Sequence, residues 1–230
     1  ETTTEAVIVL DEKKTARDAV DSLAWSPDGT MLALSGWNPE MLVWDLSSQI
    51  PVLTELKVGS LQGYKYLAWS PDSSEFAISV TANAGGGKIV RQLDIWDAKT
   101  GEKLQTVPGT DYMKLAWSPD GKYLAATMPG SQLTVLNTAD WSEHATLADL
   151  DFGMREIAWS PDGSSLALAD GRGILVFTAE TMTETSRIEV GTTNVAGLSW
   201  SPCGNYLAGS TTTNSFTFWE VQNQSEVHSV

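Results

Sequence analysis

One apolar segment recurs five times along the 230-residue chain, and a polar turn interrupts each copy at the same place. The copies read LAWSPDGTMLALS, LAWSPDSSEFAIS, LAWSPDGKYLAAT, IAWSPDGSSLALA and LSWSPCGNYLAGS. Their tryptophans lie 44, 48, 42 and 41 residues apart, at Trp25, Trp69, Trp117, Trp159 and Trp200. A repeat of this length predicts one supersecondary unit per copy, stacked against its neighbours to bury a shared core.

Each copy predicts a β-hairpin, because two short apolar runs flank a Ser-Pro-Asp-Gly turn. In the first copy Pro27 presets φ for the turn, Asp28 can bond the nearby backbone, and Gly29 supplies a positive φ. Ser73 replaces the glycine in the second copy, and Cys203 replaces the aspartate in the fifth. We therefore expect these two turns to be the least well specified.

A third and a fourth strand are predicted in each repeat. The third is almost continuously apolar, as in a sheet buried on both faces, and reads MLVWDL, LDIWDA, LTVLNT, ILVFTA and FTFWEV. The fourth has a weaker pattern that suits a partly solvated outer strand, and reads PVLTELKV, EKLQTV, EHATLADL and ETSRIEV. The pattern predicts one all-β domain over residues 1–230, a five-bladed β-propeller of four-stranded antiparallel blades. The approximate blades are 20–58, 64–107, 112–150, 154–190 and 195–221.

The last repeat clearly supplies only three strands, which run through Val221, and two segments of the chain are candidates for its fourth strand. Residues 5–10, a strong β-forming run, are expected on the outer edge of the last blade, where they would close the ring. In the alternative, residues 225–230 fold back after Val221 and leave the N-terminal strand free. A free strand could add to a neighbouring molecule and build a homo-oligomer or filament. The monomer is favoured, because intramolecular closure has the advantage in effective concentration.

The WSPDG hairpins followed by VWD, IWD or FWE resemble the WD-repeat family over nearly the whole chain. The resemblance implies a propeller that acts as a protein-interaction scaffold and is not an enzyme. The chain departs from the family because its only histidines are His144 and His228, so the usual Gly-His pair is absent. The aspartate after tryptophan remains only at Asp45 and Asp97. The family's buried His-Ser-Asp network is therefore not expected, and a similarity to TolB-like periplasmic propellers keeps a second subfamily open.

Functional residues are expected where the repeats differ, in the loops between second and third strands and between outer and next inner strands. These loops emerge on one rim and carry residue types that are enriched in protein-binding patches. The candidate partner-binding residues are Trp37, Tyr64, Tyr112, Met128, Met154, Arg155 and Arg172. A scatter of loop residues with no common partner is the alternative.

Other conspicuous residues have structural interpretations. Five equivalent tryptophans indicate packing between blades, and the repeated Asp28, Asp72, Asp120 and Asp162 indicate turns. The run from Gly85 to Lys88 lacks the spacing of a phosphate-binding loop. We expect no catalytic residue, metal or cofactor. A carbohydrate-binding or glycoside-hydrolysing five-bladed propeller remains the enzymatic alternative.

Charge narrows the class of partner. The chain has 14 basic and 29 acidic side chains, a net charge of −15, which argues against nucleic acid and membrane surfaces and is compatible with a basic protein. Cys203 is the only cysteine, so an intramolecular disulfide is excluded and a cytoplasmic location is expected. Because the sequence starts at Glu1, export of a processed form stays open.

Overall fold

The computed structural model describes residues 20–36, 40–48, 52–57, 66–83, 89–109, 112–129, 131–148, 150, 156–170, 173–190, 195–211 and 215–229. Its regular elements are β-strands, arranged as five four-stranded antiparallel sheets. Nowhere in these ranges is there a helix with the length and hydropathy needed to cross a bilayer. The all-β fold and the four strands per repeat are confirmed.

Each sheet is one blade, and its strands follow one another along the chain from the inner to the outer edge. The first contains β1 (Val20–Trp25), β2 (Met31–Gly36), β3 (Glu40–Asp45) and β4 (Val52–Lys57). The second contains β5 (Leu67–Trp69), β6 (Glu75–Asn83), β7 (Ile89–Asp97) and β8 (Lys103–Gly109). The third contains β9 (Leu115–Trp117), β10 (Tyr123–Met128), β11 (Gln132–Asn137) and β12 (Glu143–Leu147). The fourth contains β13 (Glu156–Trp159), β14 (Ser165–Ala169), β15 (Gly173–Thr178) and β16 (Glu184–Glu189). The fifth contains β17 (Val195–Trp200), β18 (Tyr206–Thr211), β19 (Phe216–Glu220) and β20 (Ser225–Ser229).

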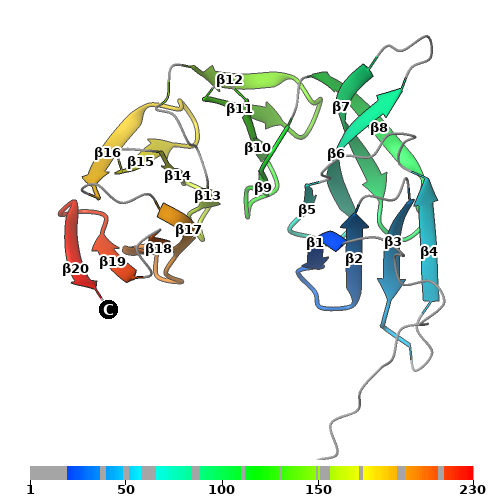
Figure 1. The fold of residues 1–230 in the computed structure, drawn as a ribbon, viewed down its shortest axis with the longest axis horizontal. Coiled ribbons are helices and arrows are strands. Elements are labelled where there is room, and N and C mark those ends of the chain that lie inside the picture. Colours follow the sequence, from blue (N-terminus) through cyan, green and yellow to red (C-terminus); the bar gives the residue numbers. More distant parts are fainter. Residues whose placement is uncertain are drawn as a thin grey trace, which may run out of the picture.

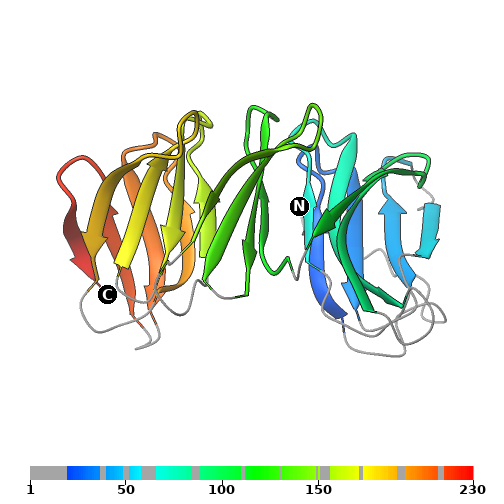
Figure 2. The same ribbon diagram turned by 90° about the horizontal axis from the view of Figure 1, so that it is seen from above.

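The blades are arranged along an arc in chain order, with the short inner strands on its concave side (Figure 1). The inner strands β1, β5, β9, β13 and β17 contact one another in sequence. Seen from above, the five sheets lie side by side in chain order (Figure 2). In the described part of the chain the first and last blades lie at opposite ends of this arc, so the predicted closure of the ring is not shown.

The core consists of clusters between neighbouring blades. Four such clusters occur among the described residues, one at each junction along the arc. At three junctions the inner-strand tryptophan also donates its indole N–H to a carbonyl of the preceding blade. These bonds run from Trp69 to Ala24 (3.1 Å), from Trp159 to Ala116 (2.9 Å) and from Trp200 to Ala158 (3.0 Å). The interpretation of the repeated tryptophans as inter-blade packing is confirmed at these positions.

The junction between the second and third blades differs. The indole N–H of Trp117 points to the carbonyl of Gly121 in its own turn at 3.4 Å, and its ring meets Trp141 edge-on with centroids 5.7 Å apart. Tyr112, Leu124 and Leu136 complete the cluster on the side of the third blade. Packing alone therefore joins these two blades at the position where the other junctions add a hydrogen bond.

The outer strand of the fifth blade is β20, which pairs antiparallel with β19. This corrects the expected placement of residues 5–10 as the fourth strand of that sheet, and it extends the blade beyond Val221. The hairpin that residues 225–229 make with β19 is the alternative that the sequence left open. Residues 5–10 themselves lie outside the described ranges, so their role in closing a ring stays a prediction.

Candidate functional site

The turn rim is the edge of the blades formed by the turns between inner and second strands. Its turns span residues 26–31, 70–75, 118–123, 160–165 and 201–206. In the first, the hydroxyl of Ser26 donates to Asp28 at 2.6 Å and accepts the backbone N–H of Met31 at 2.9 Å. The same carboxylate accepts the backbone N–H of Thr30 at 3.0 Å. The first four turns are thus each closed by their own serine and aspartate.

The turns that depart from the consensus keep the same geometry. Ser73 has a φ of 64°, close to the 72° of Gly29, and its N–H donates to the carbonyl of Ser70 at 3.0 Å. Its hydroxyl also accepts the backbone N–H of Asp28 from the neighbouring turn at 3.1 Å. In the fifth turn Cys203 takes the place of the aspartate, with its sulfur 3.3 Å from the Ser201 hydroxyl. The side chain–backbone network tolerates both replacements.

The repeated aspartates are held as carboxylates by these turns. The Ser70 hydroxyl, followed by the backbone N–H and hydroxyl of Ser74, lowers the pKa of Asp72 below its ordinary value. The equivalent partners, Ser160 first and then Ser164, lower the pKa of Asp162. Hydrogen bonds that favour the charged form explain the direction of both shifts. The hydrogen-bond geometry and the direction of these pKa shifts both support the interpretation of these aspartates as turn residues.

Shallow acidic grooves separate neighbouring turns on this rim. One groove, of about 550 Å³, lies between the third and fourth blades and is lined by Asp120, Lys122, Tyr123, Asp162 and Glu180 among others. A second, of about 400 Å³, lies between the second and third blades. Burial, with Asp72 and Asp97 nearby, raises the pKa of Glu75 in the second groove. No group of three metal-ligating side chains is found in the described part of the chain. The grooves offer negative charge, and the aspartates that line them are already hydrogen-bonded to their own turns.

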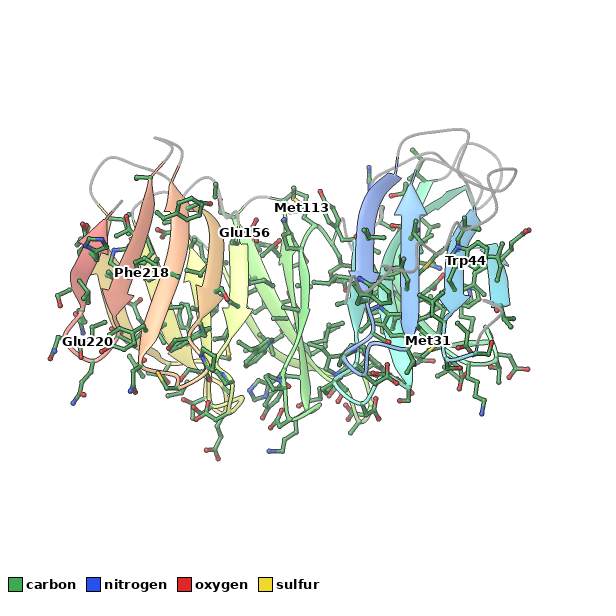
Figure 3. All side chains as sticks on the ribbon, turned by 90° about the horizontal axis from the view of Figure 1, so that it is seen from below. Met31, Trp44, Met113, Glu156, Phe218 and Glu220 are labelled. Atoms are coloured by element: carbon green, nitrogen blue, oxygen red, sulfur yellow. The ribbon has the colours of Figure 1, made fainter. Side chains whose placement is uncertain are left out.

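The loop rim is the opposite edge, where the candidate partner-binding residues were placed. Figure 3 shows Met113 and Glu156 toward this edge and Met31 toward the turn rim. Trp37, Tyr64, Met154, Arg155 and Arg172 lie outside the described residues, so their binding role stays a prediction. Tyr112 and Met128 are described, and both belong to the third blade. Tyr112 is buried in the cluster between the second and third blades, and Met128 is half-buried against that cluster.

Met113 is an exposed residue of the loop rim that the sequence reasoning missed. Its backbone N–H donates to the carbonyl of Thr127 at 2.7 Å, which places it beside Met128. The alternation of side chains in extended backbone could have identified it, since an inward Tyr112 turns the next residue outward. Next to it Lys114 pairs with Glu156 of the fourth blade at 3.1 Å. The described loop rim therefore combines two methionines with an ion pair that bridges two blades.

Acid should remove the stabilisation that the turn carboxylates provide. Because their pKa is lower in the folded chain than in the unfolded one, this stabilisation is complete above about pH 5 and is lost as the pH falls below about 4. We expect Asp162→Asn to lower the melting temperature at pH 7, since the amide cannot carry the charge. The difference from wild type should shrink steadily between pH 5 and pH 3. Thermal unfolding followed by circular dichroism checks this, and a difference that stays constant with pH would contradict it.

Comparison with known proteins agrees with the repeats. A family model described as "WD domain, G-beta repeat" matches residues 9–45. The chain is 34% identical over 119 residues to the WD repeat-containing protein slp1 of Schizosaccharomyces pombe, covering 50% of this chain and 23% of that protein. It is 32% identical over 121 residues to the B-type cell cycle switch protein ccs52B of Medicago truncatula, covering 52% and 24%.

A more extended match is to THO complex subunit 3 of Arabidopsis thaliana, 25% identical over 210 residues and covering 89% of this chain and 64% of that protein. The chain thus spans about a quarter of the length of the first two relatives and under two thirds of the third. The family match ends with the third strand of the first blade, and the structure repeats the same four-stranded unit in four further blades. Taken together, the recurring WSPDG hairpin, the four-stranded blades and these matches support a WD-repeat family protein.

Proposed function

We propose that this chain is a non-enzymatic scaffold that binds a protein partner on its loop rim. The observation that carries the proposal is the pair of methionines on the third blade, with Met113 exposed beside the half-buried Met128. Methionine is unbranched and polarizable, so it adapts to different partner surfaces and is enriched in protein interfaces. The other candidate residues of the loops would extend this apolar contact along the rim.

The turn rim supports the same proposal by its chemistry. Its aspartates are engaged by hydroxyl and backbone donors of their own turns, an arrangement that serves structure and offers no general acid paired with a base. The THO-named relative is, by its name, a subunit of a complex. We extend such an assembly role to this chain. The net charge of −15 favours a basic partner by long-range attraction.

Substitution at the loop rim tests the proposal. Met113→Asp places a charge at the centre of the proposed contact, and we expect it to weaken capture of the partner at least about tenfold, as loss of an interface anchor does. Leu104→Asp is the matched control, because Leu104 is also exposed but lies on the outer strand β8. Quantitative mass spectrometry of proteins retained by each immobilised variant provides the measurement. Equal retention by Met113→Asp and Leu104→Asp would remove the loop rim as the binding surface.

A further inference from the structure

The two ends of the arc expose apolar side chains that belong to blade faces. The tail face is the outward face of the fifth blade, with exposed Tyr206, Phe216 and Phe218. Figure 3 labels Phe218 on this last blade. The head face is the outward face of the first blade, with exposed Leu23 and Trp25 on its inner strand. Phe216 is 63% exposed, Phe218 42% and Trp25 56%, so both faces present large apolar groups to water.

The same positions are interior in every other blade. Counting back from the third-strand tryptophan or its equivalent, Phe216 corresponds to residues that are 0% exposed: Met41, Leu93, Leu133 and Ile174. Phe218 corresponds to residues that are at most 3% exposed: Val43, Ile95, Val135 and Val176. Each of these eight residues packs in the cluster formed with the following blade. The tail face therefore has the side chains of an inter-blade interface, and within the described ranges no blade packs against it.

The junction between the third and fourth blades shows which contacts the following blade makes with such a face. There Tyr123 stacks on Trp159, with ring centroids 6.0 Å apart and planes inclined by 13°. The indole of Trp159 donates to the carbonyl of Ala116 at 2.9 Å. On the tail face Tyr206 occupies the position of Tyr123, and Ser199 that of Ala116. On the head face Trp25 occupies the position of Trp159, so the two ends of the chain carry the two halves of one interface.

We propose that the tail face binds the head face of a second copy of this chain. In that contact Trp25 of one copy lies against Tyr206 of the other and donates its indole N–H to the Ser199 carbonyl, while Leu23 packs near Phe216 and Phe218. The occupant follows from continuity with the inter-blade junctions, because the first blade already presents the required tryptophan at the required position. The contact uses faces of sheets and leaves the outer strands unchanged, so it differs from an exchange of N-terminal strands.

Charge sets how this association depends on salt. Each copy carries −15, so two copies repel at low ionic strength, and the apolar contact must overcome that repulsion. We expect the dissociation constant measured by sedimentation equilibrium to fall severalfold when sodium chloride is raised from about 50 to about 500 mM. An association held by ion pairs would weaken over the same range.

Complementation between two variants tests the direction of the contact. Phe218→Asp disables the tail face and Leu23→Asp disables the head face; both residues are exposed, so both variants should fold, which circular dichroism checks. We expect the wild type to exceed its monomer mass of 24.8 kDa in light scattering, and each variant alone to stay at that mass. An equimolar mixture of the two should form a complex of two chains, because each variant keeps the face that the other lacks. Leu104→Asp, on β8 and away from both faces, should associate like the wild type.

Each remaining outcome contradicts the proposal. A wild type that stays monomeric at all concentrations and salt levels would show that no second copy covers these faces. Association of Phe218→Asp alone would indicate contact between two head faces or an exchange of strands, and association of Leu23→Asp alone would indicate contact between two tail faces. Should either variant fail to fold, Phe216→Asp and Trp25→Asp replace it on the same face. A mixture that remains monomeric while the wild type associates would exclude head-to-tail packing.

Discussion

Trp159→Ala is expected to lower the free energy of unfolding by about 3–5 kcal/mol, as truncation of a large aromatic side chain in a core does. Trp159 is 8% exposed and packs between the third and fourth blades with Leu166 and Phe177. The change also removes the stack on Tyr123 and the indole hydrogen bond to Ala116. Since these contacts join two blades, we expect the loss to affect cooperative unfolding of both.

Trp25→Ala is the matched control, because Trp25 occupies the same position of the repeat in a blade that has no preceding blade in the arc. It is expected to cost less than about 1 kcal/mol, in the range of substitutions at exposed sites. Urea unfolding measured in the Phe218→Asp background keeps both proteins monomeric. Equal losses at the two sites would mean that the inner tryptophan stabilises its own hairpin and contributes little between blades.

The comparison of Trp25 with Trp159 shows which structural features the repeat pattern predicts and which it does not. The pattern predicts the hairpins, the four strands per blade and the interior position of the tryptophans, because turn chemistry and apolar alternation act over a few residues. Burial of a given tryptophan depends on the neighbouring blade. Trp25 and Trp159 have nearly identical local sequences, yet one is exposed and the other buried. Whether a ring closes is decided by contacts between distant residues, which a local pattern does not encode.

The outer strand of the fifth blade illustrates the same limit. Residues 5–10 are richer in β-forming side chains than residues 225–229, and propensity therefore favoured them. The structure pairs β20 with β19 through a short turn in which Gln224 has a φ of 52°. Closing a short loop loses much less entropy than bringing the two ends of the chain together. Here the local hairpin prevails over the stronger β-forming run.

For the candidate site, the sequence selected residues in the loops between strands, but it did not predict the direction of each side chain. Tyr112 was selected for its residue type, and the structure buries it between two blades. Its neighbour Met113 is the exposed residue. The type of a residue indicates whether its side chain suits a binding surface. Its burial depends on the register of the strand that enters the blade. Because successive side chains of extended backbone point to opposite faces, the burial of one residue predicts whether its neighbours are buried or exposed.

Asp94 was overlooked because the other prominent aspartates of the repeats lie in turns. It lies within β7 and is buried, and the partners of its carboxylate lie on β7 itself and on the outer strand β8. One oxygen accepts from Gln92 at 2.8 Å and from the Thr106 hydroxyl at 2.7 Å. The other lies 3.5 Å from the ammonium of Lys103. Since these partners engage both oxygens, Asp94 links β7 to β8 and is not a free acid of an active site.

Asp94→Ala is accordingly expected to destabilise the chain by about 2–3 kcal/mol, because it leaves Thr106 and Gln92 without their charged acceptor. Asp94→Asn keeps an acceptor oxygen for both donors and loses only the charge. Lys103 is partly exposed and can be hydrated again, so the asparagine variant should lose about 1 kcal/mol. Urea unfolding of the three proteins at pH 7 provides the comparison. If asparagine cost as much as alanine, the ion pair with Lys103 would be the main stabilising contact, and the hydrogen bonds within the blade would be secondary.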